Sequence, residues 1–167
     1  MKKILLTICF IFYCFNSVYA ISTVDELIEY CKKDPQTISE WIISHIEYKS
    51  DFDKWGILDY FQSPSQTLSI DNKYDLQSGD CEDYAILAFA CLKKLGYKPR
   101  LLVMYGNNRA HCICIFIYKG RWNYLGEEPL TKTNVLFPGW IMYSYNIKEK
   151  TNYLIYFFLD ETEITLE

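Results

Sequence analysis

The amino-acid sequence predicts an α+β domain, with helices in its first half and an antiparallel sheet in its second. Apolar residues recur at helical spacing in residues 22 to 33 and 37 to 48, and residues 81 to 95 form a longer helical pattern. Residues 100 to 105, 110 to 118 and 121 to 125 are short apolar runs separated by turn residues, which is typical of strands in consecutive hairpins. Helices followed by a strand meander indicate an α+β arrangement.

Further signals fill in the rest of the domain. Thr37 and Glu40 are spaced as a capping box, and Pro35 is expected to separate the first two helices. Residues 51 to 76 mix turn residues with aromatic ones, so we expect an irregular segment with one short helical piece at residues 64 to 68. Ordered segments of this length are often functional. Two last strands are expected at residues 140 to 146 and 153 to 160.

The start of the chain has the pattern of a secretory signal peptide. Lys2 and Lys3 precede an apolar run over residues 4 to 15, and Val18-Tyr19-Ala20 is a small-residue cleavage signal. No later stretch approaches the roughly 20 apolar residues of a membrane span. We therefore expect residues 1 to 20 to be removed and residues 21 to 167 to form one secreted or periplasmic domain without a membrane span.

Charge and cysteine content exclude several classes of protein. The formal net charge is −4, and the loss of Lys2 and Lys3 with the signal makes it more negative, which argues against nucleic-acid or anionic-membrane partners. Seven cysteines become five once Cys9 and Cys14 are removed, so at least one thiol stays free unless chains pair. No cysteine spacing matches a zinc site. Disulfide pairing and oligomeric state stay open.

The segment Ser78-Gly79-Asp80-Cys81-Glu82-Asp83 places one cysteine at a junction between a loop and a helix. Asp80 or Ser78 can cap the first backbone N–H groups of this helix, and Asp83 follows Asp80 at capping-box spacing. Residues 85 to 92 are apolar on every face, which a helix tolerates only when other elements cover it. We expect this helix to be the centre of the domain.

Cys81 is a candidate nucleophile because a helix N-terminus stabilises a thiolate. Its three acidic neighbours oppose this effect, since a carboxylate about 8 Å away costs a thiolate roughly 2 kcal/mol at an effective dielectric near 20. A reactive Cys81 therefore requires these carboxylates to be occupied by backbone N–H groups, by an arginine such as Arg100 or Arg109, or by a cation. The alternative is a buried structural cysteine.

Two histidines are available as a general base for the thiol. His45 falls on an amphipathic helix, where a residue at the core edge is expected. His111 opens a strand whose following residues are apolar on both faces, as in an interior strand. A histidine at the rim of such a strand, beside the helix of Cys81, stands where a base must be. The alternative is a strand-end histidine with a structural hydrogen bond.

The run Gly79-Asp80-Cys81-Glu82-Asp83-Tyr84-Ala85, the upstream segment from Tyr60 to Leu68 and the later Ala110-His111 resemble the transglutaminase-like superfamily. Within it they are most similar to the bacterial transglutaminase-like cysteine proteinases. The resemblance implies a papain-like α+β fold with N-terminal helices, a central helix that carries Cys81, and a neighbouring strand that carries His111. It also implies that Asp80 and Glu82 bind calcium, although no cofactor is required. The opposing interpretation is that Asp80 and Asp83 are helix caps.

The sequence departs from this family where an acidic residue usually orients the histidine. Gly126 stands at that position, and Glu127 comes one residue late, which on a strand points the opposite way unless the backbone bends. The side chain of Asn123 would also point to the opposite face of the strand. Among Asn123, Glu127 and Glu128 we favour Glu127, because Gly126 can adopt a backbone conformation that re-aims it.

These residues predict a thiol-dependent acyl-transfer enzyme, most simply a cysteine peptidase that acts on a protein or peptide substrate. His111 would take the proton of Cys81, and the backbone N–H of Cys81 with a second donor, for which Gln62 is the candidate, would hold the oxyanion. A glutamine deamidase or transglutaminase is an alternative. So is a catalytically inactive binding module, which the acidic neighbours of Cys81 and Gly126 favour.

Overall fold

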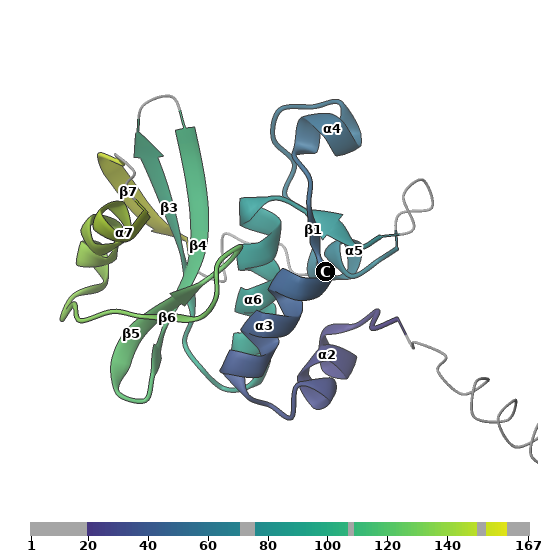
Figure 1. Cartoon of the computed structure of the whole chain (residues 1–167), viewed down its shortest axis with the longest axis horizontal. Helices are drawn as coiled ribbons and strands as arrows, with labels where there is room; N and C mark the ends of the chain where they lie inside the picture. The colour runs from purple at the N-terminus through teal and green to yellow at the C-terminus, as the bar shows by residue number, and fades with distance from the viewer. Residues whose placement is uncertain (1–19, 71–75, 107–108, 150–152, 160–167) are drawn as a thin grey trace, which may run out of the picture.

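The computed structural model describes residues 20–70, 76–106, 109–149 and 153–159, and it has the predicted α+β architecture. Figure 1 shows N-terminal helices packed against α6 (Cys81–Lys94) on one side of a twisted sheet, with α7 (Ile141–Glu149) on the other side. Residues 1 to 19, and with them nearly all of the predicted signal peptide, lie outside the described residues. No helix in the described part of the chain has the length and apolar character needed to cross a membrane.

Helices α2 (Val24–Tyr30) and α3 (Pro35–His45) begin the domain. Thr23 and Glu26 form a reciprocal capping box at the start of α2. The boundary predicted for the next helix is wrong: Asp34 caps α3 by accepting a hydrogen bond from Thr37 N–H, and Pro35 is the first helical residue rather than a separator. Proline fits this position because its missing N–H would have no helical partner there.

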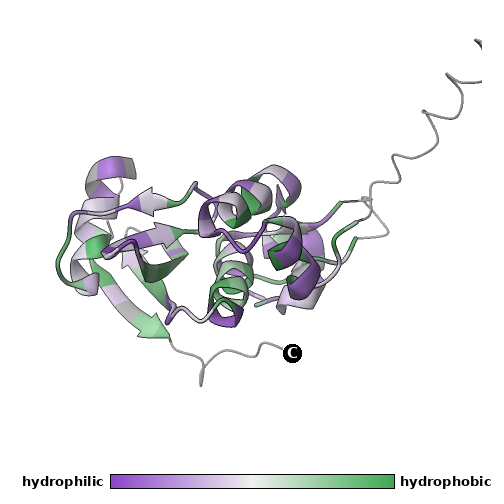
Figure 2. Cartoon of the chain, turned by 90° about the horizontal axis from the view of Figure 1, so that it is seen from below, coloured by the Kyte–Doolittle hydropathy of each residue, from purple (hydrophilic) through white to green (hydrophobic). Residues whose placement is uncertain are grey.

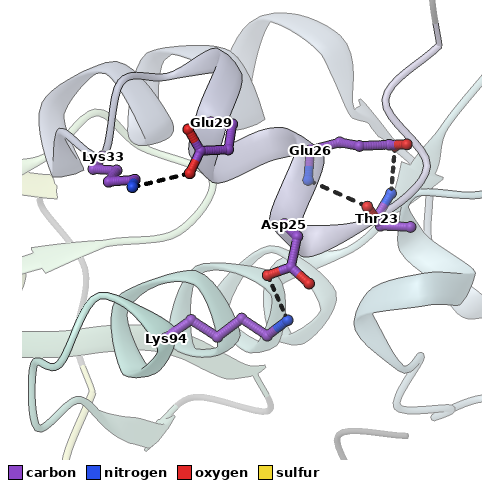
Figure 3. A network of polar contacts seen from close by, with 6 residues as sticks. All are labelled: Thr23, Asp25, Glu26, Glu29, Lys33 and Lys94. Carbon is purple, nitrogen blue, oxygen red and sulfur yellow. Dashed lines mark hydrogen bonds and ion pairs between the residues drawn. The ribbon is translucent and has the colours of Figure 1, made fainter.

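Helix α6 (Cys81–Lys94) is the centre of the domain, as predicted. It packs against α2, α3 and the short helix α5 (Pro64–Thr67) on one side and against the sheet on the other. An ion pair of 2.7 Å between Asp25 of α2 and Lys94 joins these two helices at the surface (Figure 3). Figure 2 shows the hydrophobic colouring concentrated on α6 and on the inner strands. Burial of α6 on all sides explains why its middle is apolar all round.

The sheet contains five antiparallel strands in the order β6-β5-β4-β3-β7. The three predicted central strands are confirmed, and the hairpins pair them in sequence order. Their bounds, with those of the edge strands, are β3 (Arg100–Gly106), β4 (Arg109–Tyr118), β5 (Arg121–Leu125), β6 (Thr131–Lys132) and β7 (Ile155–Leu159).

The two faces of β4 belong to two separate cores. Cys112, Cys114 and Phe116 lie in the core that α6 shares with the N-terminal helices. Ile113 and Ile115 lie in a second core beneath α7. Side chains along a strand alternate between faces, so an interior strand that is covered on both faces must be apolar at every position.

The strand predicted at residues 140 to 146 is wrong, because this segment forms a 3-10 turn (Pro138–Trp140) followed by helix α7 (Ile141–Glu149). Ile141 and Tyr145 are buried whereas Tyr143, which would share their face on a strand, is 57% exposed. Positions 141, 142 and 145 instead share one face of a helix, and Met142 is buried with the other two. The last predicted strand is confirmed as β7, and Asp160 lies outside the described residues.

The long segment before Cys81 contains two short helices, α4 (Asp51–Trp55) and α5, of which only α5 was predicted. Residues 71 to 75 lie outside the described residues. A two-residue strand β1 (Glu47–Tyr48) pairs in parallel with β2 (Ser78–Gly79). This pairing brings the end of the N-terminal helical region next to the start of α6 and thereby assembles the surroundings of Cys81.

Candidate active site

Cys81 is the first residue of α6 and is partly exposed. The other four described cysteines are buried, and all five are free thiols. Its thiol donates a hydrogen bond of 3.1 Å to Oε2 of Glu82. Burial, followed by the charge and the hydrogen bond of Glu82, raises the pKa of this thiol far above its usual value, while the backbone N–H of Cys112 acts in the opposite direction. Cys81 packs against the core that contains Cys112 of β4, the residue that follows His111.

Four acidic residues surround the start of α6 and are almost fully buried; we call Asp51, Asp80, Glu82 and Asp83 the acidic cluster. Burial raises the pKa of Asp83 to about 7 and, together with Glu82, that of Asp80 to about 8. Burial also raises the pKa values of Asp51 and Glu82. The repulsion expected from the sequence is present in several pairs: the charge of Glu82 raises the pKa values of Asp80 and of the Cys81 thiol, and the charge of Asp80 raises that of Asp83.

Asp83 is fully buried, and backbone and side-chain donors occupy its carboxylate oxygens. Oδ1 accepts the backbone N–H of Gln62 at 2.8 Å, and Oδ2 accepts the backbone N–H of Asp80 at 3.2 Å, as the capping box predicts. The side-chain amide of Gln62 also donates to Oδ2. These contacts tie the segment before α5 to the first turn of α6.

The contacts of Gln62 do not support the predicted role of this residue as an oxyanion donor. Its side chain is 1% exposed, and its Nε2 donates to Asp83 and, at 3.3 Å, to the carbonyl oxygen of Ser78. Its Oε1 accepts a hydrogen bond of 2.7 Å from Nζ of Lys54. Gln62 thus braces the acidic cluster, and Lys54 rather than an arginine supplies a positive charge beside it. The side chain of Arg109 lies outside the described part of the chain.

The acidic cluster offers carboxylate oxygens, the kind of ligand that calcium binds. One carboxylate oxygen from each of Asp51, Asp80 and Asp83 lies within 4.8 Å of the others, and Asp51, Asp59 and Glu82 form a second such group. Within the described residues, the buried Oδ1 atoms of Asp51 and Asp80 accept no hydrogen bond. Calcium prefers several oxygen ligands, and these unused oxygens fit that preference. Asp80, one of the two predicted ligands, belongs to the first group, and Glu82, the other, belongs to the second. Asp51 belongs to both groups.

His111 lies on β4, is 5% exposed, and has a partner at each ring nitrogen. Nδ1 lies 3.6 Å from Oε1 of Glu127, so the predicted contact between these residues is present. Nε2 lies 2.8 Å from the hydroxyl of Tyr145 on α7, which also donates to Oε1 of Glu128. Burial, followed by the charges of Glu128 and Asp80, raises the pKa of Glu127 to about 7.

The other residues considered from the sequence lie elsewhere. The side-chain amide of Asn123 donates hydrogen bonds to the carbonyl oxygens of Tyr118 and Arg121 within its own hairpin. These contacts hold Asn123 in the hairpin rather than at His111. His45 stacks on Trp41 with ring centroids 4.6 Å apart, as a core-edge residue would. The sequence analysis missed Tyr145, because a segment taken for a strand gave no reason to place its hydroxyl at His111.

Comparison with known proteins identifies the family of the chain. A family model described as the transglutaminase-like superfamily matches residues 23–126, which is more than half of the chain, and the protein belongs to this superfamily. The match spans the N-terminal helices, α6, the strand that carries His111, and β5 with Gly126 directly after it. Comparison with curated proteins gives no match.

Three solved structures illustrate the structural likeness. Legionella pneumophila LapG has 22% identity and a TM-score of 0.48 over 66% of this chain and 63% of LapG. A structure titled as calcium-bound LapG from the same organism has 25% identity and a TM-score of 0.47, with 66% and 65% covered. A crystal structure of a TGase has 15% identity and a TM-score of 0.43, with 79% and 39% covered. The matched region is thus less than two thirds of each of these chains.

We predict that the protein becomes less stable as the pH rises from about 4 to about 8. The pKa values of Asp80, Asp83 and Glu127 are raised above the unfolded values of about 4, so in this range the folded state holds more protons than the unfolded state. The free energy of unfolding, measured by urea denaturation, should be higher at pH 5 than at pH 8 by more than about 1.4 kcal/mol, the equivalent of one pKa unit.

The variant Asp80→Asn provides the control for this pH dependence. It keeps the shape of the side chain and removes one of the three groups that titrate, so its stability should change less between pH 5 and pH 8. A wild-type protein that gains stability over this range would contradict the assignment of raised pKa values.

Proposed function

We propose that this protein is a cysteine peptidase that acts on a protein substrate through Cys81 and His111. The observation that carries the proposal is the position of Cys81, which begins the central helix and packs against the core that contains Cys112, the residue after His111. Membership of the transglutaminase-like superfamily supports it, because thiol-dependent acyl transfer is the chemistry that the resemblance implies. The bond attacked is a main-chain amide in this proposal, and a glutamine side-chain amide is the alternative.

In the proposed reaction, the imidazole of His111 accepts the thiol proton of Cys81 and the thiolate attacks the substrate carbonyl carbon. The backbone N–H of Cys81, in the first turn of α6, has no partner within the helix and donates to the resulting oxyanion. The imidazolium then returns its proton to the leaving amine, and water hydrolyses the thioester. The helix N-terminus favours the negative charge at each of these stages.

The acidic cluster is the proposed calcium site. Asp51, Asp80 and Asp83 would provide carboxylate oxygens, with Glu82 as a further ligand from the same turn. A bound divalent cation would offset the carboxylate charges that now disfavour the thiolate of Cys81. The unused Oδ1 atoms of Asp51 and Asp80 support this site more strongly than the mere presence of acidic residues does.

The proposed location is outside the cytoplasm. The signal-peptide pattern of residues 1 to 20 supports export, and five free cysteines do not require a particular redox compartment. The mass of the protein recovered from the periplasm or medium of its cells tests this, since cleavage after Ala20 leaves Ile21 as the first residue. Recovery of the uncleaved chain in the cytoplasm alone would contradict export.

A catalytically inactive binding module is the second candidate function. The raised pKa of the Cys81 thiol favours it, because burial and Glu82 keep the sulfur protonated. Gly126 favours it as well, since this position has no side chain that could orient the histidine. Both candidates have the same fold, so the reactivity of Cys81 distinguishes them.

We predict that iodoacetamide modifies Cys81 faster than any other cysteine, and that His111→Gln slows this modification at least about tenfold. Cys81 is the most exposed of the five described cysteines, so selectivity alone would reflect access, whereas dependence on His111 reports activation. Mass spectrometry of digested samples gives the rate at each cysteine. Cys81→Ala should retain the fold by circular dichroism and lose hydrolysis of a denatured protein substrate.

Modification of Cys81 at the same rate in wild type and His111→Gln would exclude His111 as the base and favour the binding module. Unfolding of Cys81→Ala would instead assign the cysteine a structural role. His45→Gln is the matched control, since His45 lies on α3 and stacks on Trp41 away from the site.

We also predict that calcium binds the wild-type protein and that Asp80→Asn weakens the binding. Isothermal titration calorimetry measures the affinity directly. Asp25→Asn is the matched control, because Asp25 is an exposed carboxylate paired with Lys94 on a different part of α6. Absence of binding heat in the wild type, with Cys81 modification unchanged by a chelator, would show that the acidic residues serve only the fold.

A further inference from the structure

We propose that Tyr145, held by Glu128, is the positioning residue that orients His111, in place of the acidic side chain that Gly126 lacks. The inference rests on the proposed function, because orientation of the imidazole matters for a base that acts on Cys81. It concerns two residues outside the motif of Cys81, one of them on a helix near the end of the described chain.

The contacts of Tyr145 support this role. Its hydroxyl lies 2.8 Å from Nε2 of His111 and donates to Oε1 of Glu128. Its ring lies beside the imidazole with centroids 5.2 Å apart, and Tyr153 stacks on the imidazole at 6.1 Å. Tyr145 is 3% exposed and His111 is 5% exposed, so water competes little for these hydrogen bonds.

The hydrogen-bond donors and acceptors next to the imidazole determine the tautomer of His111. Burial and the hydrogen bond to Glu128 raise the pKa of Tyr145 far above its usual value, so its hydroxyl keeps its single proton. That proton is donated to Glu128, which leaves the phenolic oxygen as an acceptor toward His111. Nε2 must then carry the hydrogen, and Nδ1 is left with the lone pair that can take a proton.

Nδ1, on the other side of the ring, lies 3.6 Å from Oε1 of Glu127. Burial, with the charges of Cys81 and Glu127 among others, raises the pKa of Tyr48 to about 12, so Glu127 and Cys81 act on the same neighbouring residue. Nε2 points instead into the core beneath α7, where Tyr145 lies. Glu127 therefore stands beside the reactive nitrogen, and the group behind the imidazole is Tyr145.

Gly126 explains why the support comes from α7. A Cβ atom at this position would lie 3.6 Å from Cγ2 of Ile113, two residues along β4 from His111 and on the same face of the strand. An acidic side chain there would extend toward the imidazole from the neighbouring strand. Without that side chain, the hydroxyl of Tyr145 reaches Nε2 from the helix that covers this face, and Glu128 supplies the negative charge behind it.

Nitrogen-15 NMR of the two histidine rings in the intact mature protein tests the proposal. We expect the Nε2–H tautomer for neutral His111 in the wild type. His45 is an internal contrast, because its Nδ1 lies 3.0 Å from the carbonyl oxygen of Trp41, which favours the Nδ1–H tautomer, and 2.8 Å from the hydroxyl of Ser44. His45→Gln assigns the signals. Tyr145→Phe should reduce the Nε2–H population of His111 and slow iodoacetamide modification of Cys81 about tenfold, the effect of one lost hydrogen bond.

The matched control is Tyr124→Phe, which removes another buried hydroxyl from a ring packed against Tyr145 at 5.5 Å. This variant should retain the wild-type tautomer and rate. An Nδ1–H tautomer for His111 in the wild type would overturn the proposal without need of a variant, as would unchanged modification of Cys81 in Tyr145→Phe. If Cys81 of the wild type shows no dependence on His111, the proposed function fails, and the tautomer measurement still decides the role of Tyr145.

Discussion

The candidate site depends on the hydrogen bonds that the buried carboxylate of Asp83 accepts. This carboxylate accepts hydrogen bonds from the backbone and side chain of Gln62 and from the backbone of Asp80, and so joins the irregular segment before α5 to the first turn of α6. The same contacts keep the acidic cluster close to Cys81. The candidate nucleophile thus stands among buried carboxyl groups whose ionisation opposes that of the thiol, so reactivity requires these groups to be protonated or offset by a positive charge.

The sheet separates two sets of groups, and His111 connects them. The start of β4 meets Cys81 and the acidic cluster on the side of α6, and the core beneath α7 supplies Tyr145. Nε2 of the imidazole lies within hydrogen-bond distance of the Tyr145 hydroxyl, and Nδ1 lies 3.6 Å from a carboxylate oxygen of Glu127. These polar neighbours account for a buried histidine near the start of an apolar strand, since buried polar groups require partners.

Local signals in the sequence were enough to predict α6 and the central hairpins, because capping residues and apolar periodicity act over a few positions. The motif around Cys81 and the placement of His111 at the start of an interior strand indicated the family. Tyr145 and the bracing role of Gln62 could not be predicted in this way, since each depends on a contact between segments more than twenty residues apart. The helix α7 was missed because its buried positions also fit a short strand until Tyr143 is known to be exposed.

Beside burial, the charge of Glu82 is what most disfavours ionisation of the Cys81 thiol. The direct test is the pH dependence of the thiolate absorbance of Cys81, taken as the difference between wild type and Cys81→Ala and repeated in a Glu82→Gln background without calcium. Loss of the charge that accepts the thiol hydrogen bond should lower the ionisation midpoint of Cys81 by at least about one pH unit, equivalent to about 1.4 kcal/mol. A midpoint that is the same with and without the charge of Glu82 would contradict the claim.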